Sequence, residues 1–167
     1  IILVDGSSKD GTLEVCREYS RQYPDLIKTY DQGDSEGKPA ALNIGLSHAS
    51  GEIIAVFDAD SVPDKDVLLR VASYFEDSSV VAVQGLTSSI NENENMLTKI
   101  AAMEEAAWFR TLIQGKDELG LFVPITGSCQ FIRRSILDQL GGWDEKCLAE
   151  DVDVAAKLVE RGFSVKY

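Results

Sequence analysis

The feature that most constrains the fold is a regular alternation of short apolar runs with segments of helical periodicity. The runs typical of buried strands are residues 1–4, 52–57, 80–86, 128–134 and 163–167. The segments that predict helices are residues 13–23, 39–49, 64–75, 96–112, 135–140 and 152–161. This alternation predicts an α/β fold built from βαβ units, with a mostly parallel sheet and helices on both faces. In such folds the functional site lies at the carboxyl ends of the strands.

The chain length and net charge limit the number of domains and the kinds of partner that we expect. The 167 residues predict one domain, 1–167, and the net charge of −12 argues against a nucleic-acid partner. Three cysteines without metal-ligand spacing indicate reduced thiols and a cytoplasmic location. The sequence holds no apolar run of about 20 residues that would span a membrane. Because it starts within IILVD and stops within FSVKY, we expect it to be part of a longer protein.

Two carboxylates stand directly after one of the apolar runs. Residues 53–64 read IIAVFDADSVPD, so Asp58 and Asp60 follow the strand with only Ala59 between them. Carboxylate oxygens of this kind bind Mg²⁺ together with substrate phosphates. The alternative is a solvated turn started by the two aspartates and completed by Ser61 and Pro63.

Three further positions are candidates for binding. Asp5 ends the first strand, where a carboxylate can accept a hydrogen bond from a base or ribose, although the loop DGSSKDGT also reads as an ordinary capped turn. Lys38 precedes a helix N-terminus, an arrangement that suits a phosphate, although a surface lysine is the simpler interpretation. Thr126, Gly127 and Ser128 form a small turn lined with hydroxyl groups.

The last candidates lie in the C-terminal third. Glu150 and Asp151 are adjacent at a helix start, where they either complement the helix dipole or supply a general base. Arg133 and Arg134 either bind a phosphate or start the next helix, and Trp143 either stacks on a sugar or belongs to the core.

Five motifs together resemble a known family. They are IILVDGSSKDGT, EGKPAALN, GEIIAVFDADSVPD, TGSCQFIRRSILDQLGGWDE and LAEDVDVAAKLVERG, in this order. They resemble the family-2 glycosyltransferases, which are inverting enzymes of the GT-A fold that use nucleotide-diphospho-sugars. The GSCQFIRR and GGWDE…AEDVD segments are most similar to the processive polysaccharide synthases, such as those for cellulose, chitin, hyaluronan or poly-N-acetylglucosamine.

The resemblance implies a role for each candidate residue. Asp5 would contact the uracil of a UDP-sugar donor, and Lys38 its diphosphate. Asp58 and Asp60 would hold Mg²⁺ or Mn²⁺ on that diphosphate. Asp151 would be the catalytic base, and Glu150 beside it would contact substrate. The pocket of the saccharide acceptor would be lined by Thr126, Gly127 and Ser128.

The sequence also departs from the family pattern. The family domain normally opens with a strand carrying a P-x-Y-N-type motif, and this sequence starts one strand later, so we expect a GT-A sheet without its first strand. The Q-x-x-R-W motif and the membrane helices of processive members are not present either. The resemblance therefore implies a parent protein bound to the cytoplasmic face of the cell membrane through segments outside this chain.

Other functions compete with this interpretation. A haloacid-dehalogenase-type phosphatase also uses a strand followed by D-x-D-x-[T/V], which DADSV matches, but there the motif belongs on the first strand. A nucleotidyltransferase would need a loop rich in glycine and arginine near its start. A binding-only relative or an inert fragment is the alternative outside the enzymes.

Overall fold

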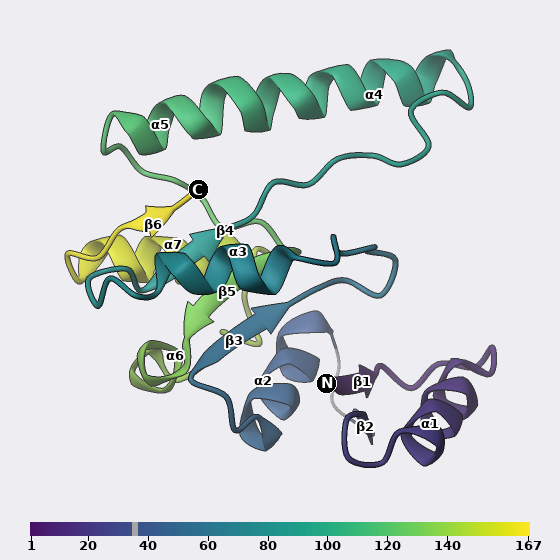
Figure 1. Ribbon diagram of the computed structural model, residues 1–167. Helices are drawn as coiled ribbons and strands as arrows, with labels where there is room; N and C mark the ends of the chain where they lie inside the picture. The colour runs from purple at the N-terminus through teal and green to yellow at the C-terminus, as the bar shows by residue number, and fades with distance from the viewer. Residues whose placement is uncertain (35–36) are drawn as a thin grey trace.

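The computed structural model describes residues 1–34 and 37–167 (Figure 1). In chain order the elements are β1 (Ile2–Asp5), α1 (Thr12–Gln22), β2 (Lys28–Asp31), α2 (Lys38–His48), β3 (Ile53–Val56), α3 (Val67–Tyr74), β4 (Ala82–Gln84), α4 (Met96–Ala107), the π-helical turn η1 (Trp108–Ile113), α5 (Gln114–Glu118), β5 (Gln130–Arg133), α6 (Arg134–Leu140), α7 (Glu150–Glu160) and β6 (Val165–Lys166). The alternation of strands and helices is confirmed. Strand β2 was not predicted, because its residues KTYD form no apolar run.

The strands form two sheets. Strands β1 and β2 pair in parallel, while the second sheet has the order β3-β5-β4-β6. The prediction of a mostly parallel arrangement is wrong for this second sheet, because β5 runs antiparallel to both β3 and β4. The chain leaves β4 at Gln84, passes through α4, η1 and α5, and re-enters at Gln130, which pairs with Gln84. When the connection between two neighbouring strands starts and ends at the same edge of a sheet, the second strand must run antiparallel to the first.

Helices cover both faces of the four-stranded sheet, as predicted. On one face Ile132 of β5 joins a large buried cluster with Leu137 of α6 and Val154 of α7. On the other face Phe131 packs with Val71 of α3. Successive residues of a strand point to opposite faces, so β5 supplies both cores from neighbouring positions.

Helix α2 joins the two sheets. Its residues Leu42 and Leu46 pack against the large buried cluster. Gly45 lies against β1 instead, since a Cβ built there would be 3.7 Å from a methyl group of Val4. Within the described residues the two sheets share no strand pairing, so this helix carries much of the contact between them.

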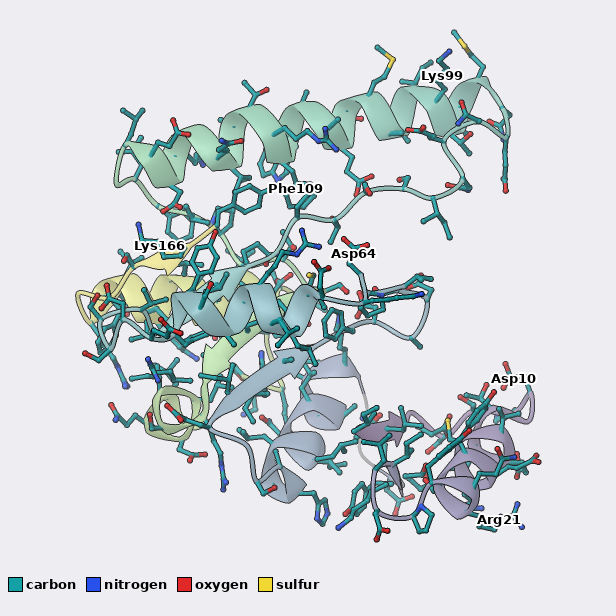
Figure 2. All side chains as sticks on the ribbon, viewed as in Figure 1. Asp10, Arg21, Asp64, Lys99, Phe109 and Lys166 are labelled. Atoms are coloured by element: carbon teal, nitrogen blue, oxygen red, sulfur yellow. The ribbon has the colours of Figure 1, made fainter. Side chains whose placement is uncertain are left out.

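The segment between β4 and β5 forms one long helical rod above the sheet (Figure 1). It continues from α4 through η1 into α5, so the predicted break at residues 114–120 comes only after Glu118. Phe109 points toward the body of the molecule, while Lys99 lies on the outer side (Figure 2). The predicted apolar stripe of Met96, Ile100, Met103 and Ala107 faces solvent. None of the described helices is both long enough and apolar enough to cross a membrane.

Candidate active site

One end of the four-stranded sheet collects most of the predicted site residues. Asp58 and Asp60 follow β3, and the turn of Thr126, Gly127 and Ser128 precedes β5. Because β3 and β5 are antiparallel, the end of the first and the beginning of the second lie at the same edge. The N-termini of α2 and α7 bring Lys38 and Asp151 to the same place, as the contacts of Gly127 show.

Lys38 connects two of these segments. Its ammonium group forms an ion pair with the carboxylate of Asp58 and donates a hydrogen bond to the carbonyl oxygen of Gly127 at 2.9 Å. The side chains of Lys38 and Asp58 are 38% and 41% exposed, so the pair is open to solvent and to a ligand. A cation at the start of a helix, reachable from solvent, provides a suitable environment for a phosphate group.

The two aspartates after β3 differ in their surroundings. Asp58 is half-buried, and its backbone N–H donates to the hydroxyl of Ser128 at 3.1 Å, which fixes the start of the loop. The side chain of Asp60 is exposed. Oxygen donors of this type suit Mg²⁺ or Mn²⁺, and both aspartates fit such an ion in their chemistry. In the described part of the chain no three His, Cys, Asp or Glu residues cluster around a common point.

Gly127 lies between the lysine and the carboxylate of Asp151. A Cβ built on Gly127 would be 2.8 Å from Nζ of Lys38 and 3.5 Å from Oδ2 of Asp151. Only glycine therefore leaves both side chains where they are. Asp151 accepts a hydrogen bond from the N–H of Val152 at 2.8 Å through its other oxygen, and neighbouring Glu150 is buried.

Asp5 lies on the smaller sheet. It is buried, and its carboxylate accepts a hydrogen bond from the N–H of Ser8 at 2.9 Å, so it closes the turn after β1. Gln32 connects this region to the others, since its N–H donates to the carbonyl of Asp5 and its amide donates to the carbonyl of Gly37, next to Lys38. The described residues show no hydrogen bond or ion pair between the Asp5 carboxylate and Lys38 or Asp58.

Two interpretations left open by the sequence are decided by the contacts. Arg133 donates to the carbonyl oxygens of Val80 and Phe75 and pairs with Glu52, so it ties β5 to its neighbours, while Arg134 starts α6. Trp143 is 2% exposed and belongs to the large buried cluster.

Sequence reasoning missed two side chains that brace the site. Gln84 at the end of β4 binds the backbone of the turn that contains Gly127. Asn43 of α2 accepts from the N–H of Trp143 and donates to its carbonyl, so it holds the turn that leads to α7. A polar residue at the end of an apolar strand was the available signal for Gln84.

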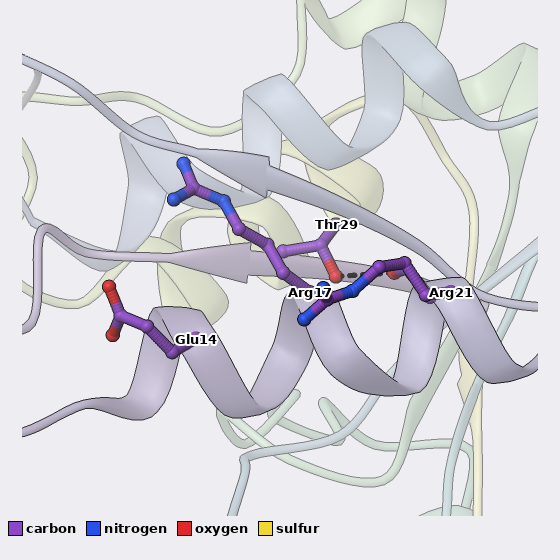
Figure 3. A pocket seen from close by; sticks show the side chains of 5 residues that line it. Glu14, Arg17, Arg21 and Thr29 are labelled. Atoms are coloured by element: carbon purple, nitrogen blue, oxygen red, sulfur yellow. Dashed lines mark hydrogen bonds between the residues drawn. The ribbon is translucent and has the colours of Figure 1, made fainter.

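A separate surface hollow of about 420 Å³ lies between α1 and β2 (Figure 3). Its lining includes Arg17, Arg21 and Glu14, with Thr29 at its base bonded to the carbonyl of Cys16. None of the residues described above contributes to it, so it is distinct from the candidate site.

Comparison with known proteins identifies the family. The family model described as "Glycosyltransferase like family 2" matches residues 1–167. The chain belongs to this glycosyltransferase family. The resemblance inferred from the five motifs is thereby confirmed, and nothing supports the phosphatase alternative.

Two curated relatives illustrate the range of the family. This family-2 chain is 36% identical over 159 residues to the beta-monoglucosyldiacylglycerol synthase of Trichormus variabilis, covering 93% of the chain and 33% of the relative. It is 28% identical over 167 residues to the poly-beta-1,6-N-acetyl-D-glucosamine synthase of Staphylococcus epidermidis, covering 100% of the chain and 40% of the relative. The chain thus spans less than half the length of these relatives.

A solved structure supports the GT-A fold of this family-2 chain. The mannosyltransferase PcManGT from Pyrobaculum calidifontis, in complex with GDP-Man and Mn²⁺, matches with a TM-score of 0.79 at 25% identity, over 99% of the chain and 44% of that protein. The GT-A fold is confirmed. The missing first strand stays a prediction.

Proposed function

We propose that the protein transfers a sugar from a UDP-sugar to a hydroxyl of a saccharide acceptor with inversion, in polysaccharide synthesis. The single observation that carries this proposal is the convergence of Lys38, Asp58, Gly127 and Asp151 at one end of the sheet. It brings an ammonium group and two carboxylates together beside a residue without a side chain, which supports the roles proposed below for a phosphate ligand, a metal ligand and a general base.

The donor site uses the residues nearest β3. Asp58 and Asp60 would hold Mg²⁺ or Mn²⁺ together with the diphosphate, and the Mn²⁺ bound with GDP-Man in PcManGT supports a divalent ion. When bound, such an ion neutralises charge on the departing nucleotide diphosphate. Lys38, which pairs with Asp58 here, would turn to the diphosphate oxygens. Asp5 would accept a hydrogen bond from the uracil.

The transfer step assigns Asp151 as the base. Its carboxylate takes the proton of the acceptor hydroxyl, and the acceptor oxygen forms a bond to the anomeric carbon. The bond from that carbon to the diphosphate oxygen breaks, and the diphosphate leaves with the electron pair. A single displacement inverts the anomeric centre and needs no covalent nucleophile. Thr126, Gly127 and Ser128 would line the acceptor pocket, and Glu150 would contact substrate.

The wider setting of the site is also proposed. Residues 1–167 form one catalytic domain, and the parent protein presents it at the cytoplasmic face of the cell membrane through segments outside this chain. The free thiols of Cys16, Cys129 and Cys147 are consistent with a reducing compartment.

Metal-dependent nucleotide binding tests the donor site. We expect UDP to bind in the presence of Mn²⁺ and to bind weakly after chelation, and we expect Asp60→Asn to lower the affinity measured by calorimetry. Asp66→Asn is the matched control, because Asp66 is exposed, directly precedes α3 and pairs with Arg70 of that helix. Equal UDP affinity with and without Mn²⁺ would remove the metal role.

Acceptor turnover tests the base. Asp151→Asn in the full-length protein should leave UDP affinity unchanged and lower the transfer rate by about 10²–10⁴-fold, since the acceptor hydroxyl then keeps its proton. Asp138→Asn, on the exposed face of α6, should leave the rate unchanged. UDP binding without transfer in the wild-type protein would instead favour the binding-only alternative.

A further inference from the structure

The strand β4 ends in a buried polar side chain that the proposed reaction does not use. Residues 80–83 are apolar and buried, and Gln84 follows them with only 1% of its surface exposed. A buried amide is destabilising unless its hydrogen bonds are satisfied, whereas an apolar residue would fill the core without that requirement. The partners of this amide therefore indicate what it does.

The Gln84 amide binds both ends of the turn before β5. Its Oε1 accepts from the N–H of Thr126 at 2.8 Å, and its Nε2 donates to the carbonyl oxygen of Ser128 at 3.1 Å. The same Nε2 donates to the carbonyl of Gly85 at 2.9 Å and lies 3.4 Å from that of Cys129. The donor and acceptor of one side chain thus hold residues on either side of Gly127.

The turn held in this way contacts two residues of the proposed donor site, the ammonium group of Lys38 and the backbone of Asp58. The carbonyl of Gly127 accepts from Lys38, and the hydroxyl of Ser128 accepts from the N–H of Asp58. Each contact depends on where the backbone of the turn lies. A shift of the turn would therefore move Lys38 and Asp58 together.

The backbone of the turn needs such support. Cys129 has φ of 53°, which is a conformation that residues with a side chain rarely adopt. It is held by the hydrogen bond from the N–H of Gly85 to its carbonyl at 2.8 Å, next to the carbonyl that Gln84 binds. A strained bend persists only when its surroundings hold it firmly.

We propose that Gln84 is a positioning residue for glycosyl transfer, which fixes the turn of Thr126, Gly127 and Ser128 so that Lys38 and Asp58 are held for the nucleotide diphosphate. This inference rests on the proposed function for its effect on the rate. Its effect on the turn does not depend on that function.

A substitution that removes the hydrogen bonds of Gln84 can be compared with one that affects packing alone. Gln84→Leu keeps a side chain of similar volume but loses every hydrogen bond of the amide. It should lower kcat in the full-length protein by about 10²-fold. Val83→Ala is the matched control, because Val83 is the preceding buried residue and faces the other side of the sheet. It should destabilise the sheet and leave kcat within about twofold when both variants are assayed well below their melting temperatures.

Gln84→Glu provides a pH-dependent test. In its neutral form the introduced carboxyl group both accepts and donates, as the amide does, but in its ionised form it cannot donate. Burial raises the pKa of such a group, so the ratio of variant to wild-type kcat should fall by about tenfold or more as pH rises from about 6 to about 9. A constant ratio over this range would overturn the proposal, as would a Gln84→Leu variant with wild-type kcat.

Hydrogen exchange tests the positioning without reference to activity. The amide of Thr126 should be protected in the wild-type protein and should lose that protection in Gln84→Leu while the amides of β5 keep theirs. Unchanged exchange at Thr126 would contradict the inference. If wild-type protein transfers no sugar but Thr126 responds as expected, the proposed function fails and the role of Gln84 in the turn stands.

Discussion

The four-stranded sheet and the two-stranded sheet both carry predicted site residues, yet they are stabilised in different ways. The β3-β5-β4-β6 sheet lies between two buried clusters, one on each face. The β1-β2 sheet is covered by α1, which has no buried residue, and it is held by its parallel strand pairing and by α2.

The two sheets also differ in the chemistry proposed for their residues. Asp58 and Gly127 belong to segments that leave or enter the well-packed sheet, and Asp151 lies at the start of α7, which packs on that sheet. The proposed diphosphate and acceptor positions therefore lie on the more extensively packed part of the molecule. Asp5, which is proposed to read the base of the nucleotide, belongs to the thinly packed sheet. We therefore expect local opening of the protein to affect nucleotide recognition before it affects the transfer geometry.

The largest expected effect contrasts a core position of the four-stranded sheet with a position on α1, the helix that covers the two-stranded sheet. Phe131→Ala removes a ring that is 1% exposed and that packs edge-on against Phe57, and it should lower the free energy of unfolding by about 3–5 kcal/mol. Val15→Ala in α1 removes a side chain that is 55% exposed and should change it by no more than about 0.5 kcal/mol. Urea denaturation measures both. Comparable losses would show that α1 is packed as firmly as β5.

The next effect concerns the rate rather than the fold. Gly127→Ala introduces a methyl group 2.8 Å from Nζ of Lys38, and this flexible end can move away at little cost in stability. We expect an unchanged melting temperature and a transfer rate lower by about 10-fold or more, because Lys38 would leave its place beside Asp58. Gly115→Ala, with no atom within 4 Å of the added methyl group, is the control. It should leave the transfer rate unchanged and raise the melting temperature slightly, because Gly115 lies within α5 and alanine favours a helix.

The sequence predicted the parts of the molecule that local pattern determines. The apolar runs predicted β1, β3, β4, β5 and β6, and the motifs placed Lys38, Asp58 and Asp151 at element ends, where the structure also has them. Which site residues would meet was predicted only through the family resemblance.

The local sequence pattern did not predict the direction in which strands pair, or which side of a helix is exposed. The antiparallel direction of β5 depends on where the long excursion through α4 returns. The stripe of Met96, Ile100 and Met103 has helical periodicity but faces solvent, because Phe109 and Ile113 supply the buried side of the rod. The role of Gln84 depends on a turn more than 40 residues away in sequence.

A smaller effect is expected in alkaline solution. Burial raises the pKa of Tyr167, at the end of the four-stranded sheet, to about 12. The folded protein holds this proton more tightly than the unfolded chain, so the associated stability is present below about pH 10 and is lost as pH rises toward 12. Tyr167→Phe should unfold like the wild type at neutral pH and lose less stability in this alkaline range. Parallel curves for both proteins throughout would contradict the assigned burial.

The smallest expected effect tests the joint between the two sheets. Gly45 lies within α2, and a Cβ there would make ordinary contacts with Val4 and Ile2 of β1, at 3.7 and 4.0 Å. Gly45→Ala should therefore raise the free energy of unfolding by about 0.5–1 kcal/mol through helix propensity alone. Because the added methyl group lies against β1, we also expect slower hydrogen exchange in β1 than in the wild type, with β5 unchanged. Slower exchange in β5 but not in β1 would mean that α2 stabilises the larger sheet and leaves the smaller one independent.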